Sequence, residues 1–222
     1  MENFKFRTLR ADEIDCRVGT VTDKGCSLLM YKDARVDMRL LDEVVGATNW
    51  KREHELINGN LFCTVSIWDG EKKEWVSKQD VGVESNTEKE KGQASDAFKR
   101  ACVNWGIGRE LYTCPFVWIN LTAEEWRQGT SGRKQPKTRF YVTHIEYEEG
   151  NVSYLRIVDE SGKERYLFGM SAKEKEAIME VTAVADVKEL EKVYRKYERQ
   201  YSQSAQFIAA CNKRKNELLK AA

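Results

Sequence analysis

The stretch KQDVGVESNTEKEKGQASDAFKRACVNWGIGRELY, residues 78–112, decides the fold. Its second half predicts a helix that begins near Thr87 and ends at Gly106 and Gly108, because glycine is the usual residue at a helix C-terminus. The apolar side chains of this helix recur at helical spacing and share one face: Ala94, Phe98, Ala101, Cys102 and Trp105. Three basic residues lie outside that apolar stripe: Lys91, Lys99 and Arg100.

Three strand candidates precede this helix, with short turns between them. They read WKREHELI (50–57), LFCTVSIWD (61–69) and EWVSKQDVG (74–82), and Asn58-Gly59 and Asp69-Gly70 mark the turns. Such short connections predict an antiparallel meander, on which the apolar face of the long helix should pack. An earlier helix is predicted over residues 33–45, with Asp33 as its cap and Gly46 at its end.

The second half of the chain predicts a further hairpin and a helical tail. RFYVTHIEY (139–147), VSYLRIVDE (152–160) and RYLFGM (165–170) alternate like strands, and residues 171–222 are charged with helical spacing. The fold class is therefore α+β, with a β-β-β-α core, an extra β-hairpin and a helical C-terminal tail. We place a boundary near residue 170, which gives domains 1–170 and 171–222. The tail helices look too charged to form a core of their own, so we expect them to pack on a neighbour or stay mobile.

The composition excludes several classes of protein. The chain has 222 residues and a net charge of +1, and it contains no apolar run of about 18 residues that could span a membrane. Its N-terminus lacks the apolar stretch of a secretory signal, which predicts a soluble intracellular protein. The six cysteines form no C-x-x-C pair, so we expect reduced thiols and no zinc site.

The common nucleotide and hydrolase motifs are also absent. There is no phosphate-binding P-loop, and Gly106-Ile107-Gly108 follows a helix rather than a strand, so it is no dinucleotide fingerprint. One enzymatic interpretation survives: Asp69 with the run Glu71-Lys72-Lys73 resembles fragments of a Mg²⁺-dependent nuclease site. Against it, these residues sit in a turn, where charges gather for ordinary reasons of solvation.

A second interpretation is a basic groove with aromatic platforms, which is how proteins hold single-stranded nucleic acid. Tyr31 precedes two charged residues at a strand-to-helix corner and could stand exposed. The segment RQGTSGRKQPKTR, residues 127–139, has five basic residues and no acid. This segment either contacts phosphates, through Arg133, Lys134 and Lys137, or is a solvated surface loop.

The decisive stretch resembles the central signature of the Rad52/Rad22 superfamily of single-strand annealing proteins, including its phage members. The superfamily pattern is a strand ending in D-V-G, a polar link, and a helix with D-x-[LF]-K-R-A and a terminal aromatic-Gly. This chain has Asp80-Val81-Gly82, Asp96, Phe98-Lys99-Arg100-Ala101 and Trp105-Gly106. The superfamily also carries an Arg just before the first strand, a Tyr before the first long helix and a Gly-x-x-x-Trp after it. Here these are Arg17, Tyr31 and Gly46 to Trp50, so the resemblance covers about residues 10–115.

The resemblance implies a non-enzymatic protein that binds single-stranded DNA and anneals complementary strands without ATP, in recombination and double-strand break repair. It further implies a homo-oligomeric ring or filament, no cofactor or metal, a phage or prophage source, and action in the cytoplasm of a bacterial host. As protein partners we consider a single-strand-binding protein or an exonuclease. The implied DNA-binding residues are Arg17, Tyr31, Lys91, Lys99 and Arg100. One departure is Val103, where the superfamily often has another basic residue; the 127–139 segment would compensate for it. A single-strand-binding protein without annealing activity and the nuclease remain the alternatives.

Overall fold

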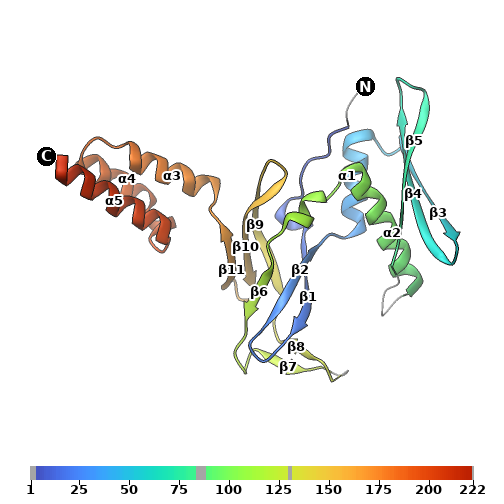
Figure 1. Ribbon diagram of the computed structural model, residues 1–222, viewed down its shortest axis with the longest axis horizontal. Coiled ribbons are helices and arrows are strands. Elements are labelled where there is room, and N and C mark those ends of the chain that lie inside the picture. The colour runs from blue at the N-terminus through green and yellow to red at the C-terminus, as the bar shows by residue number, and fades with distance from the viewer. Residues whose placement is uncertain (1–3, 84–88, 130–131, 222) are drawn as a thin grey trace. The chain divides into compact units, whose positions relative to one another are not determined.

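The chain forms two compact units, residues 1–167 and 168–222, and each is described by itself. The computed structural model describes residues 4–83, 89–129 and 132–221 (Figure 1). Antiparallel sheets and helices make up the first unit, which confirms the predicted α+β class.

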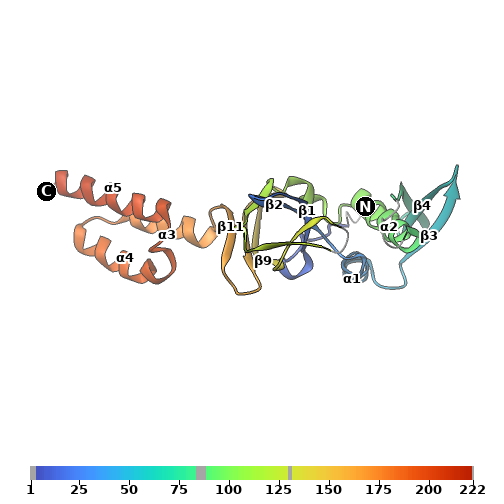
Figure 2. The same ribbon diagram turned by 90° about the horizontal axis from the view of Figure 1, so that it is seen from below.

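The predicted meander and its long helix are both present. Strands β3 (Trp50–Ile57), β4 (Asn60–Asp69) and β5 (Glu74–Val81) form a three-stranded antiparallel sheet in that order. Asn58 and Gly59 both have positive φ, as a two-residue hairpin turn between β3 and β4 requires. Helix α2 (Lys89–Trp105) lies against β4 and β5 (Figures 1 and 2). The predicted helix start, Thr87, lies outside the described residues.

The apolar face of α2 holds it on the sheet as predicted. Phe98, Ala101 and Cys102 are fully buried, and the Trp105 indole donates a hydrogen bond of 3.0 Å to the carbonyl of Val65 on β4. Truncation of such a buried Phe to Ala typically costs about 3–5 kcal/mol. Burial of this face therefore fixes the rotation of α2 about its axis, and with it the direction of the basic residues on its outer side.

Helix α1 (Ala34–Val45) also begins and ends where the sequence predicts. The Asp33 carboxylate accepts a hydrogen bond of 2.8 Å from the Arg35 amide, and Gly46 follows the last turn with φ of 84°. Leu40 and Leu41 are fully buried, and α1 packs on α2 and β3. The helix thus joins the meander to the larger sheet of this unit.

That larger sheet has six strands in the order β11-β10-β9-β1-β2-β6. Strands β9 (Phe140–Glu148), β10 (Asn151–Asp159) and β11 (Glu164–Gly169) were predicted as the extra hairpin, whereas β1 (Asp15–Val21), β2 (Gly25–Tyr31) and β6 (Val117–Asn120) complete the sheet. The placement of Arg17 just before the first strand was wrong. Arg17 is the third residue of β1 and pairs with Leu29 of β2, because the short connection at residues 22–24 folds the two strands onto each other.

The basic segment 127–139 is only partly a loop. Strand β7 (Trp126–Gln128) pairs antiparallel with β8 (Lys134–Pro136), so a small hairpin carries most of the positive charge. The Lys134 ammonium lies 4.4 Å from the centre of the Trp126 ring and forms an ion pair with Asp23. These contacts hold the Lys134 side chain in place, although composition alone puts this residue in a solvated loop.

The second unit consists of helices α3 (Ala172–Ala183), α4 (Val187–Tyr201) and α5 (Ala205–Ala221), which pack on one another (Figure 2). The expectation that they are too charged to form a core was wrong. A separate cluster is buried among them: Ala177, Val181, Val184, Leu190, Phe207 and Cys211. Phe207 is fully buried, and three tyrosine rings of α4 surround it at centroid distances of 5.8 to 6.3 Å. The large aromatic rings allow the three helices to form a core from few apolar residues. Within the described part of the chain, no helix is long and apolar enough to cross a membrane, and all six cysteines are free thiols.

Candidate nucleic-acid interface

A cleft of about 250 Å³ lies where the end of β2, the outer side of α2 and the short 3-10 helix η2 (Arg109–Thr113) meet. Its polar and aromatic lining comprises Tyr31, Lys32, Asp96, Lys99, Arg100 and Tyr112. Three predicted DNA-binding residues, Tyr31, Lys99 and Arg100, therefore come together in one cavity from separate elements. The remaining lining is mostly apolar, so the cleft combines cations with flat hydrophobic surface.

Tyr31 and Lys99 face each other across this cleft. Tyr31 is 41% exposed as a residue, and the Lys99 ammonium lies 6.0 Å from the centre of its ring, within reach of a cation–π attraction. Arg17 lies on β1 beside this pair, because the register Asp15–Tyr31 and Arg17–Leu29 places Arg17 and Tyr31 on the same face of the sheet. Asp15, which pairs directly with Tyr31, lies on this face as well, so both an acid and a cation of β1 stand near the ring.

Arg100 is already engaged by an acid. Its Nε donates a hydrogen bond of 3.2 Å to Oδ1 of Asp80, the first residue of the D-V-G signature. The Asn104 amide also donates to Asp80, at 3.4 Å. The Arg100 side chain keeps 43% of its surface exposed. Its guanidinium has five N–H donors and Asp80 accepts from Nε alone, so a phosphate can bind the terminal nitrogens beside this carboxylate.

The other signature residues hold β5 against α2. A Cβ atom at Gly82 would lie 2.2 Å from the carbonyl oxygen of Gln93, so a larger residue there would push the helix away. One oxygen of Asp96 accepts a hydrogen bond of 3.0 Å from the Val83 amide just beyond the strand. The motif is therefore a set of contacts that fixes α2, and the basic pair on it, relative to the sheet.

Lys32 is a cleft residue that sequence reasoning missed. Only 4% of its side chain is exposed, and its ammonium forms an ion pair with the fully buried Asp37 of α1. Burial raises the pKa of the Asp37 carboxyl to about 6, although the ammonium of Lys32 opposes this shift. Gly108 covers the lysine stem: a Cβ there would lie 2.3 Å from Cε of Lys32, and φ is 72°. The only hint in the sequence is a lysine before a helix cap, which ordinarily means a solvated side chain.

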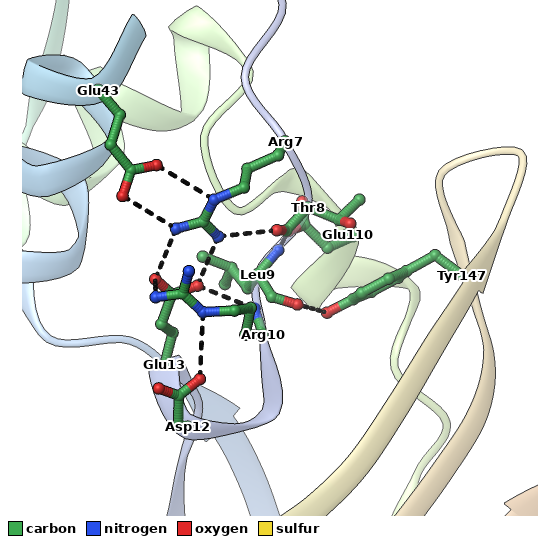
Figure 3. Close-up of polar contacts among 9 residues, drawn as sticks. All are labelled: Arg7, Thr8, Leu9, Arg10, Asp12, Glu13, Glu43, Glu110 and Tyr147. Atoms are coloured by element: carbon green, nitrogen blue, oxygen red, sulfur yellow. Dashed lines mark hydrogen bonds and ion pairs between the residues drawn. The ribbon is translucent and has the colours of Figure 1, made fainter.

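A polar cluster near the N-terminus fixes the wall of the cleft formed by η2 (Figure 3). Glu110 of η2 accepts a hydrogen bond of 2.7 Å from the Leu9 amide, and the Tyr147 hydroxyl of β9 donates to the Leu9 carbonyl at 2.9 Å. The same N-terminal segment is tied to α1, because Arg7 bonds both Glu13 and Glu43. The segment therefore joins η2, α1 and β9 behind the cleft.

A second hollow of about 560 Å³ shares Tyr31 with the cleft and extends along β1 and β9. Its lining includes Gln135, Pro136 and Arg139 of the 127–139 segment, and two acids, Asp12 and Asp15, line it together with Arg139. Arg133 and Lys137 are exposed outside this lining, and Lys134 is bound to Asp23.

Lys91 is exposed and lies apart from the cleft lining. It precedes Lys99 by eight residues, which is about 12 Å along α2 at about 1.5 Å per residue. The structure thus gathers Tyr31, Lys99 and Arg100 in one cavity and places Arg17 beside them, whereas Lys91 stands further along the helix.

The residues of the nuclease interpretation form an ordinary turn. Oδ1 of Asp69 accepts hydrogen bonds of 3.0 and 3.1 Å from the amides of Glu71 and Lys72, as an aspartate does when it stabilises its own turn. Among the described residues, no group of three or more His, Cys, Asp or Glu side chains is arranged to hold a metal ion. The turn geometry gives Asp69 a structural role.

Comparisons with known proteins agree with the signature. Residues 6–129 match the sequence profile described as the Rad52/22 family double-strand break repair protein. A protein named single-stranded DNA-binding protein DdrA from Deinococcus radiodurans is 34% identical over 113 residues, which cover 50% of this chain and 49% of that protein. Its namesake from Deinococcus deserti is 34% identical over 114 residues, which cover 49% of this chain and 55% of that protein. The matched region thus spans about half the length of these relatives, and no solved structure matches the chain significantly.

Proposed function

Because this chain belongs to the Rad52/22 family of double-strand break repair proteins, we propose that it binds single-stranded DNA and anneals complementary strands without nucleotide hydrolysis. The observation that carries the proposal is the cleft in which Tyr31, Lys99 and Arg100 meet. Cations along such a groove attract the phosphates of any sequence, and an exposed aromatic ring stacks on any base. An annealing protein must bind strands of any sequence, and contacts to phosphates and to the faces of bases do not depend on sequence.

Binding and annealing have different requirements, and the cleft in which Tyr31, Lys99 and Arg100 meet is compatible with both. A groove that holds the backbone through phosphates leaves the Watson–Crick edges of the bases free to pair with a second strand. The free energy of base pairing then drives the reaction, so the proposed mechanism includes no covalent step and no cofactor. The names of the two relatives, which describe single-stranded DNA-binding proteins, support the binding half of this proposal.

The test of the proposed function is a pairing assay. Two complementary labelled oligonucleotides are mixed with the protein in the absence of ATP, and duplex formation is followed with time. Faster pairing supports annealing. Binding without faster pairing would instead indicate a single-strand-binding protein, and binding of neither strand would refute the proposal.

The nuclease alternative is tested with the same labelled strands in the presence of Mg²⁺. We expect the strands to remain intact. Degradation that disappears in the Asp69→Ala variant would replace the annealing proposal with a nuclease. The Glu149→Gln variant is a suitable control, because it removes an exposed carboxylate from a different turn of the same unit, between β9 and β10.

Assembly into a ring or filament, and action in a bacterial cell that carries the phage or prophage gene, belong to the same proposal. Electron microscopy of the protein with and without DNA tests the assembly. Closed rings or continuous filaments are expected, and isolated monomers on DNA would contradict this part. A single-strand-binding protein or an exonuclease remains the proposed kind of protein partner.

A further inference from the structure

We infer that Tyr112 and Tyr31 form the walls of a slot that takes one nucleobase of the bound strand, with Lys99 and Arg100 directed at the flanking phosphate. The inference rests on the proposed function and names what the cleft itself holds. It also assigns a role to Tyr112, which neither the sequence motif nor the comparisons single out.

The first support is the exposure of Tyr112. Its side chain is 74% exposed, although it lines the same cleft as Tyr31. A large aromatic ring in solvent gains stability by burial, and exposed aromatic side chains are a common feature of binding surfaces. A base stacked on the ring would provide that burial.

The second support is the rigidity of the backbone beneath this ring. Within η2, Glu110 is bonded to the Leu9 amide (Figure 3), and the Thr113 hydroxyl accepts a hydrogen bond of 2.9 Å from the Val152 amide. The Arg109 guanidinium donates two hydrogen bonds of 2.8 Å to the carbonyls of Val103 and Asn104 at the end of α2. These contacts attach η2 to the N-terminal segment, to β10 and to α2. Little backbone freedom therefore disappears when a ligand stacks on Tyr112.

The third support is the chemistry and size of the cavity. Met30, Val103 and Leu111 give its lining an apolar part. Lys99 and Arg100 provide positive charge, whereas Lys32 is paired with Asp37. This pattern matches a nucleotide, whose base has flat apolar faces and whose phosphate carries the charge. A volume of about 250 Å³ is below the roughly 300–1,000 Å³ of pockets for drug-sized ligands, which favours one base over several.

Val103 has a physical role in this arrangement. In the lining of the slot, this valine offers an apolar surface to a base, whereas a lysine there would need solvent or a charged partner.

The test compares a fluorescent oligo-dT with an oligonucleotide of equal length that carries abasic sites throughout. Tyr112→Ala should lower the affinity for oligo-dT between about fivefold and about a hundredfold, the range expected for one stacked base. It should leave the affinity for the abasic strand and the salt dependence unchanged, because the phosphates keep all of their cationic partners. Tyr112→Phe keeps the ring and should retain the affinity of the wild type.

Phe116→Ala is the matched control. Phe116 is 75% exposed and only four residues away, yet it lies outside the cleft lining, so its removal should leave both affinities unchanged. Equal losses on both strands, no loss in Tyr112→Ala, or an equal loss in Phe116→Ala would overturn the base slot while single-stranded DNA binding stands. If the wild-type chain binds neither strand, the proposed function fails and the slot fails with it.

Discussion

Replacement of Glu13 by glutamine should destabilise the first unit strongly and in a pH-dependent way. The Glu13 side chain is 1% exposed, and its two oxygens accept four hydrogen bonds of 2.7 to 2.9 Å (Figure 3). Three come from the guanidinium groups of Arg7 and Arg10, and one from the Arg10 amide. The hydrogen bonds from Arg7, more than any other interaction, hold the pKa of this carboxyl at about 2. Glutamine fits the same space but cannot carry the charge that orders both arginines.

The expected loss follows from that pKa. A shift from the ordinary 4.5 to about 2 corresponds to about 3 kcal/mol, since each tenfold change in proton affinity is worth about 1.36 kcal/mol. Solvent around the half-exposed Arg10 reduces this, so we expect Glu13→Gln to lose about 2–3 kcal/mol of unfolding free energy at pH 7. The folded pKa is lowered, so this stability is present above the unfolded pKa of 4.5 and is lost as the pH falls towards 2. At pH 3, more than half of the difference between the variants should be gone.

Urea unfolding of the wild type and of Glu13→Gln at pH 7 and pH 3 measures both quantities. Glu43→Gln is the matched control, because Glu43 also bonds Arg7, at 3.1 Å, but its side chain is 45% exposed. It should cost no more than about 1 kcal/mol. An equal cost for the two variants, or a Glu13→Gln cost that is the same at both pH values, would refute the reasoning.

Three further predictions concern the cleft and the tail. Lys32→Met should cost about 3–5 kcal/mol in urea unfolding, because it leaves the Asp37 carboxyl buried without its partner, and Lys32→Met/Asp37→Leu should recover much of that loss. Asp80→Asn should tighten the binding of oligo-dT about twofold to threefold, because it releases Arg100 from a half-exposed ion pair. Weaker binding would contradict this and show that Asp80 positions Arg100 for the phosphate. A chain shortened after residue 169 should fold and bind oligo-dT like the whole chain, because residues 168–222 have a separate core. Loss of binding in a shortened chain that still folds would place the tail in the interface.

The sequence predicts the meander and α2 well because their signals are local. The Asn58-Gly59 turn and the apolar spacing through Phe98 each favour one structure on their own. The strands β1 and β2 carry a weaker signal, since exposed polar residues such as Arg17 alternate with half-buried ones and the pairing depends on distant β6 and β9. The core of the tail was missed because a few residues from three helices meet on Phe207, which no single helix reveals.

The residues of the candidate site also fall into two groups: those that the sequence reveals and those that only the structure reveals. Lys99 and Arg100 can be found in the sequence because they stand outside the apolar stripe of a strongly predicted helix. Lys32 and Tyr112 cannot, since the burial of a lysine by Asp37 and the exposure of a tyrosine on η2 both depend on tertiary structure. Residue type alone suggests a solvated lysine and a buried tyrosine, and the structure shows the reverse.

The measurement that tests the central claim most directly is a titration of fluorescent oligo-dT at several salt concentrations with the wild type and the Lys99→Ala/Arg100→Ala variant. If the cleft holds the strand, the variant should bind more weakly. The slope of log affinity against log salt should also fall by about 0.7 for each phosphate that no longer has a cationic partner, or about 1.4 for the pair. The urea midpoint should be little changed, since both side chains lie outside the core. Unchanged affinity and slope would contradict the account and place any bound DNA on another face of the protein.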